Sequence, residues 1–217
     1  MTHFKDFDIG LQYFTGIPNG YLDDFRKSFD SDDVRLSEQE FEPAPFSAME
    51  WVIPTAIAIY IAKPFIDVII KRAADDFGDA VYPRVKNAII NLVRKLYISD
   101  RLPIMLVTSS GPKEDASELI QFSIYSETNT LRRIKFVFTK TYSEQQYNQC
   151  VNQVFTILTE HHSKLGGDDT LSQQIAQLPE NRQDHIFLVY DDQAETWFVR
   201  DPIQESINRK RDPDKAS

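Results

Sequence analysis

Cysteine is almost absent from this sequence, since Cys150 is the single one among 217 residues. A disulfide needs two cysteines, so no internal disulfide framework can hold the fold, and the chain suits a reducing compartment. The first ten residues also lack the apolar stretch of a secretory signal, because Lys5, Asp6 and Asp8 interrupt them. We therefore expect a cytoplasmic protein, with peripheral contact to a membrane as the alternative.

An excess of positive charge is missing too. Lys and Arg number 24 against 33 Asp and Glu, which gives a formal net charge of −9. Residues 1–50 hold eleven acids against four bases, whereas residues 51–100 hold five acids against seven bases. An acidic surface repels phosphate backbones, so general nucleic-acid binding is disfavoured. The separation of acidic and mildly basic regions favours a protein partner, or self-association, driven by charge.

Motifs for catalysis and metal binding are lacking as well. The chain contains no HExxH, CxxC or EF-hand spacing and no GxSxG elbow. Ser109–Lys113 lacks the GxxxxGK[ST] pattern of a phosphate loop and precedes an expected strand, so we interpret it as a turn. His161 and His162 would point about 100° apart on a helix and are poorly placed to share one metal. Cys150 lies in the middle of an expected helix, where a structural thiol is favoured over a nucleophile. We expect neither a metal nor a cofactor.

No apolar run reaches the length of a membrane span. Trp51–Ala62 is uncharged, but Lys63 and Asp67 follow before Ile70, and a span needs about 20 mostly apolar residues. We interpret 51–70 as two helical pieces, kinked near Pro64 and buried in a globular core. Insertion into a membrane and binding of a partner are the alternatives. Their contact residues would include Trp51, Ile57, Ile59 and Ile61.

The remaining patterns predict a mixture of strands and helices. Period-two alternation of apolar residues is typical of half-buried strands, and apolar spacing of three and four is typical of helices. Strands are expected near 7–13, 34–36, 104–107, 120–125, 133–138, 185–190 and 196–199, and helices near 21–29, 85–96, 141–164 and 170–178.

These expectations describe an α+β fold. Hairpin-length connections favour a mainly antiparallel sheet, in the order β-β-β-α-β-β in the C-terminal half, packed with a helical N-terminal and central part. We expect one integrated domain. Its parts are an acidic arm with a strand and a helix (1–46), a helical segment with the kinked apolar helix (47–98), the antiparallel sheet with its helix (99–202) and a flexible tail (203–217).

Basic residues provide one candidate binding face. Arg132, Arg133 and Lys135 lie together on an expected strand, and Arg94 and Lys95 end the amphipathic helix before it. Together they are a candidate face for an anionic partner.

Catalytic candidates are sparse. If the chain is an enzyme, His185, Asp191 and Asp192 at the ends of an expected strand are the candidates. Our leading hypothesis is a non-catalytic interaction or regulatory protein of the bacterial cytoplasm. A membrane-acting effector that uses residues 51–70, and an enzyme whose site is dispersed along the chain, are the alternatives.

Overall fold

The computed structural model describes residues 8–30, 33–42, 55–71, 76–96, 107–108, 111–112, 122–138, 142–164, 167–182, 184–201 and 204. Its centre is a seven-stranded sheet in the order β2-β1-β3-β6-β7-β8-β9, and a separate ladder pairs β4 with β5. The sheet strands are β1 (Ile9–Phe14), β2 (Leu36–Phe41), β3 (Ile57–Ile61), β6 (Phe122–Glu127), β7 (Arg133–Phe138), β8 (His185–Asp191) and β9 (Thr196–Arg200), and the ladder consists of β4 (Val107–Thr108) and β5 (Gly111–Pro112).

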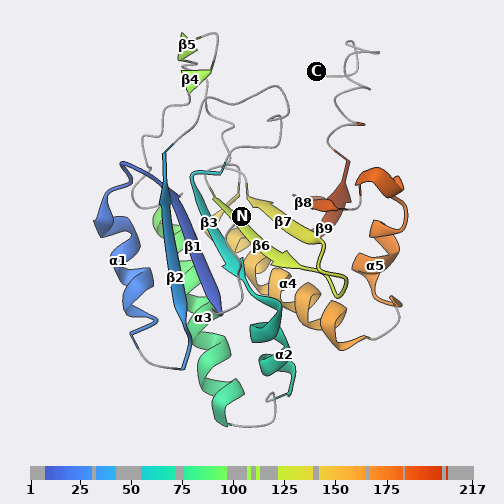
Figure 1. Ribbon diagram of the computed structural model, residues 1–217, viewed down its shortest axis with the longest axis horizontal. Helices are drawn as coiled ribbons and strands as arrows, with labels where there is room; N and C mark the ends of the chain where they lie inside the picture. The colour runs from blue at the N-terminus through green and yellow to red at the C-terminus, as the bar shows by residue number, and fades with distance from the viewer. Residues whose placement is uncertain are drawn as a thin grey trace.

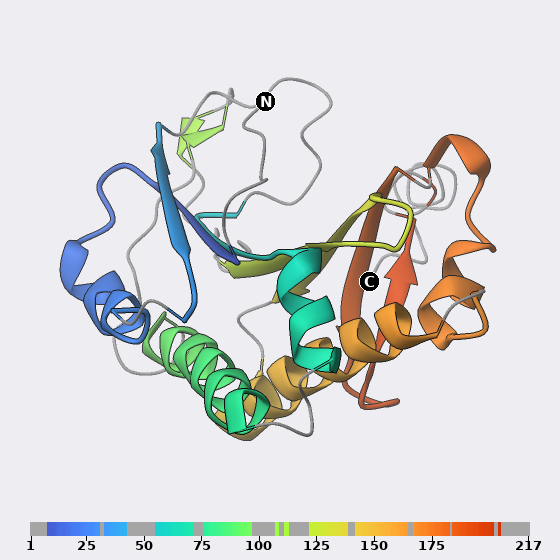
Figure 2. The same ribbon diagram turned by 60° about the horizontal axis from the view of Figure 1, so that its bottom comes forward.

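Four helices form a layer against one face of the sheet (Figure 2). They are α1 (Asn19–Lys27), α2 (Lys63–Lys71), α3 (Asp76–Arg94) and α4 (Glu144–Ser163). The short helix α5 (Thr170–Ile175) contacts α4 and β9, and the 3-10 turn η3 (Glu180–Arg182) follows it. The apolar core lies between the helical layer and the sheet. In Figure 1, α1 and β2 lie at one edge of the sheet, and β9 and α5 lie at the other.

The sheet is mixed, so the expectation of a mainly antiparallel sheet was wrong in its finer detail, although α+β holds. The pairs β1–β2, β3–β6 and β7–β8 are parallel, and the pairs β1–β3, β6–β7 and β8–β9 are antiparallel. A parallel pair requires a crossover connection, and helices lie in the connections of all three parallel pairs. The strand order also differs from the expected one, because β3 from the first third of the chain lies between β1 and β6.

The apolar run contains the central strand β3, which corrects the expected kinked helix over 51–70. Ile57, Ile59 and Ile61 are all 0% exposed and point into the core between sheet and helices. The two residues between them are also buried, so the strand is apolar on both faces. Isoleucine branches at Cβ and suits a strand flanked on both sides. A helix begins only at Lys63, and Pro64 lies in its first turn, where a missing N–H costs little.

The amphipathic helices are confirmed, with shifted starts. The stripe from Val85 to Val93 is buried along α3 and Leu96 is buried just after it, but α3 already begins at Asp76. At the start of α4 the cap is Ser143, whose hydroxyl accepts a hydrogen bond from the Gln146 amide, while the Gln146 side chain accepts one from the Ser143 amide. This reciprocal pair is a capping box. It lies two residues after residue 141, where the helix was expected to begin.

Candidate functional site

The three catalytic candidates lie at opposite ends of β8. His185 begins the strand and is exposed, whereas Asp191 ends it. Six residues of strand span about 20 Å, so one reacting group cannot contact both. Asp191 instead accepts hydrogen bonds from the amides of the turn that follows it, and Asp192 accepts one from a glutamine of α4. The backbone bonds lower the pKa of Asp191. These aspartates organise a turn.

The five candidate bases do not form one face. Arg133 and Lys135 lie on the face of β7 opposite to the core side chains of the same strand, whereas Arg94 ends α3 and Lys95 directly follows it. Arg132 lies in the turn before β7. The cations of the helical layer are engaged locally, since Arg94 pairs with Glu144 on α4 (3.6 Å) and Lys95 pairs with Asp24 on α1 (3.1 Å).

The candidate membrane contacts are inside the protein, as far as they are described. Ile57, Ile59 and Ile61 lie in the strand between β1 and β6. Trp51 lies outside the described residues. Within the described parts of the chain, none of the helices combines the length and the apolar character required to cross a bilayer.

Ser172, His161 and Asp169 come together in the fold, as the members of a hydrolase triad do, but their bonding differs from that of a triad. The Ser172 hydroxyl donates to Asp169 Oδ2 (2.6 Å), and His161 Nδ1 lies 3.1 Å from Asp169 Oδ1. His161 Nε2 accepts from the Asn129 amide (3.2 Å), so Nδ1 carries the ring proton. Burial raises the pKa of Asp169, but the hydrogen bonds from Ser172 and His161 outweigh it and lower that pKa. The cluster is a buried, satisfied network that caps α5.

His162 completes this network on its other side. Its Nε2 lies 3.0 Å from the Glu127 carbonyl oxygen and its Nδ1 lies 2.8 Å from Asn129 Oδ1. Burial lowers the pKa of His162 to about 4, so the ring is neutral at neutral pH and donates a hydrogen bond through only one of its two nitrogens. The two histidines therefore fasten the end of α4 to the β6–β7 turn. Among the described residues, no group of three His, Cys, Asp or Glu side chains is placed to hold a metal ion.

A lysine and two tyrosines gather on the face of the sheet opposite to the helical layer. Lys135 is 4% exposed, and its Nζ lies 5.2 Å from the centre of the Tyr125 ring. Burial lowers the pKa of Lys135 to about 7 and raises the pKa of Tyr125 to about 12. Burial, followed by a hydrogen bond with Glu127, raises the pKa of Tyr60. Perturbed groups of this kind occur at functional sites and in buried structural clusters.

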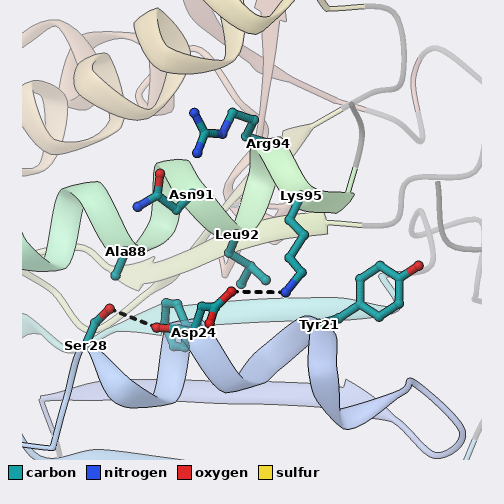
Figure 3. A pocket seen from close by; sticks show the side chains of 9 residues that line it. Tyr21, Asp24, Ser28, Ala88, Asn91, Leu92, Arg94 and Lys95 are labelled. Carbon is teal, nitrogen blue, oxygen red and sulfur yellow. Dashed lines mark hydrogen bonds and ion pairs between the residues drawn. The ribbon is translucent and has the colours of Figure 1, made fainter. Parts of the chain in front are cut away.

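A hollow of about 380 Å³ lies between α1 and α3. Its floor is formed by the buried side chains of Phe25, Ala88 and Leu92. Figure 3 shows Lys95 reaching from α3 to Asp24 across this hollow, while Arg94 points away from α1. Lys95 Nζ also donates to the backbone carbonyl at the start of α1. The polar groups at this rim thus bind each other and hold the two helices together.

Exposed carboxylates are frequent near the edge of the sheet that ends in β2. They belong to the segment from the end of α1 through β2, and we call them the acidic edge: Asp30, Asp33, Glu38, Glu40 and Glu42.

Three of these five carboxylates are not neutralised by a described base. Asp33 pairs with Arg84 (3.4 Å) and Glu38 pairs with Arg26 (3.0 Å). No ion pair to Asp30, Glu40 or Glu42 is found in the described part of the chain. The acidic edge therefore presents a negative surface to solvent.

Sequence reasoning detected the acids but misplaced the strand that carries two of them, Glu38 and Glu40. A strand was expected near 34–36, whereas β2 spans Leu36–Phe41 and ends the order of the sheet. The sequence contains little indication of this strand, because Ser37–Glu40 has no apolar residue.

Comparison of the chain with protein-family models, curated proteins and solved structures found no match.

Proposed function

We propose that the protein is a non-catalytic binding protein whose acidic edge recognises a basic surface on a partner protein. The observation that carries this proposal is the exposed carboxylates in and around the terminal strand β2, of which Glu40 in the strand and Glu42 just after it have no ion pair among the described residues. Complementary charge guides association and selects between partners, and charges at the rim of an interface act mainly on the association rate.

The distribution of the bases supports a basic partner over an anionic one. Lys135 is buried, Arg94 pairs with Glu144 and Lys95 pairs with Asp24. The cations that could have received an anionic partner are thus on different faces or engaged within the chain. In the acidic edge, by contrast, Asp30, Glu40 and Glu42 are exposed and have no ion pair among the described residues.

The membrane alternative would require the isoleucines of 57–61 to leave the core. Ile59 is 0% exposed in a strand that pairs with β1 on one side and β6 on the other. Its release would break both ladders in the middle of the sheet. The enzymatic alternative loses support because His185 and Asp191 lie at opposite ends of one strand.

A matched pair of charge reversals tests the proposal. Glu40→Lys alters the acidic edge, and Glu180→Lys makes the same change in net charge at an exposed residue of η3. Proteins captured by the wild type from its native host at low salt would be compared with those captured by each variant. We expect a basic partner that is retained by Glu180→Lys, lost with Glu40→Lys and weakened by salt.

Two results would contradict the proposal. Either the two variants capture the same proteins in equal amounts, or the protein lost with Glu40→Lys is itself acidic. Light scattering on the purified protein, at low and high salt, separates partner binding from self-association.

A further inference from the structure

The outward side of β2 carries backbone groups as well as charge. Two backbone bonds at the ends of the β1–β2 ladder, from the amide of Ile9 to the carbonyl of residue 35 and from Thr15 to Phe41, show that the odd-numbered residues of β2 bond to β1. Because bonding alternates along a strand, the N–H and C=O groups of Leu36, Glu38 and Glu40 point away from the sheet. This is the arrangement that accepts an added strand.

The opposite edge of the sheet is protected. The amide of Val199 on β9 donates to the side chain of Gln174 (2.7 Å), a residue of α5. Helix α5 packs against β9 and α4. The described residues provide no such cover for β2, which is exposed at its four inner positions. Figure 1 shows α5 beside β9, with β2 at the outer end of the sheet.

The two faces of β2 differ in chemistry. Leu36, Glu38 and Glu40 lie on the side of α1, as the Arg26–Glu38 ion pair shows. On the other face, Gln39 bonds to a glutamine of β1, and Phe41 packs against a phenylalanine of β1. A strand added to β2 would therefore meet carboxylates on one face and neutral side chains on the other.

We propose that the partner supplies an extended segment that pairs with β2 as an eighth strand and carries Lys or Arg at alternate positions. This inference rests on the proposed function and specifies the class of ligand. Opposite charges on neighbouring strands stabilise a pair, and like charges oppose it. A second copy of this chain is disfavoured for that reason, since pairing of two β2 strands would bring the glutamates of both copies into one short ladder.

Synthetic peptides of alternating lysine and threonine test the inference, with a block peptide of the same composition as the control. Fluorescence anisotropy would measure affinity, and NMR would follow hydrogen exchange at the amides of Leu36, Glu38 and Glu40. We expect the alternating peptide to bind more tightly than the block peptide and to slow exchange at these three amides. Glu40→Lys should weaken its binding about tenfold, equivalent to about 1.4 kcal/mol, and Glu180→Lys should leave it unchanged. Glu40→Gln is the milder variant if the reversal disturbs folding.

Methylation of alternate backbone nitrogens in the peptide shows whether the peptide is added as a strand, and whether it runs parallel or antiparallel to β2. In an antiparallel pair, the lysines opposite the glutamates make the backbone bonds, so N-methylation of lysines abolishes binding and N-methylation of threonines does not. In a parallel pair the bonds fall on the threonines, and the result is reversed.

The outcomes distinguish this inference from the proposed function. Equal affinity of the two methylated peptides, or of the alternating and block peptides, refutes strand addition. If binding still depends on Glu40 in that case, the acidic edge remains the binding surface. If Glu40→Lys and Glu180→Lys bind every peptide as the wild type does, both proposals are wrong.

Discussion

Replacing Lys135 with methionine should stabilise the protein at neutral pH. Lys135 is 4% exposed, and burial lowers its pKa from 10.5 to about 7. A difference of one in pKa between the folded and the unfolded chain corresponds to about 1.4 kcal/mol. Keeping this amine buried therefore costs the folded state about 5 kcal/mol at and below neutral pH. Methionine has a similar length and no charge, and it packs well beside an aromatic ring such as that of Tyr125.

The pH dependence of this gain tests its origin. Between pH 7 and 10.5 the unfolded chain holds a proton on Lys135 that the folded protein has released, so wild-type stability rises with pH through this window. The advantage of Lys135→Met should therefore shrink by about 2 kcal/mol between pH 8 and about 9.5, below the range in which tyrosines ionise in the unfolded chain. Urea denaturation of both proteins at several pH values measures it.

The matched control is Lys27→Met, because the side chain of Lys27 is 72% exposed. The change in the effect of Lys27→Met over the same window is the baseline with which the change for Lys135→Met is compared. A constant difference between wild type and Lys135→Met would show that the amine is not held neutral, and the reasoning from burial would fail.

Two further substitutions test the core and the histidine network. Ile59→Ala should lower the free energy of unfolding by about 2–5 kcal/mol, measured by urea denaturation, whereas Leu131→Ala, at a side chain that is 68% exposed, should change it by less than about 0.5 kcal/mol. Asp169→Ala should cost about 2–3 kcal/mol at neutral pH, because Asp169 caps α5 and holds His161. The pKa of Asp169 is lowered in the folded state, so its contribution to stability is present above pH 3.8 and is lost as the pH falls through the pKa of the folded protein. Thermal unfolding measures the difference in stability between wild type and Asp169→Ala. If this difference is as large in acid as at neutral pH, the reasoning is contradicted.

The elements predicted correctly are those whose signal is local. Helix α4 carries a capping motif and a long apolar stripe, and the β6–β7 and β8–β9 hairpins alternate clearly around short turns. The parallel pairings were missed because they are set by crossover connections that only the assembled sheet reveals. The helical α1 between β1 and β2 was nevertheless a usable sign of a parallel pair.

The error at β3 has a physical explanation. A strand buried on both faces loses the alternation that identifies half-buried strands, so an apolar run alone cannot separate a strand from a buried helix. The deciding information was the choice of residue and the length. Ile57, Ile59 and Ile61 are branched at Cβ, and Pro54 and Pro64 leave only the nine residues 55–63 between them, which is the length of a strand. For the candidate site, composition revealed the excess of acids in residues 1–50, but not their placement on an edge strand.

The side chains of β2 differ in what they contribute to folding. Leu36 packs against the core, and Glu38 binds Arg26, which in turn donates to the Tyr13 hydroxyl (3.2 Å). These two side chains add to the β1–β2 ladder in attaching the strand to the rest of the protein. Glu40 has no ion pair among the described residues, and it places a second negative charge two positions from Glu38 on the same face. A carboxylate in such a position prevents unselective pairing at the open edge and favours a strand that brings cations. Stability measurements should therefore be insensitive to Glu40→Gln, while binding should not be.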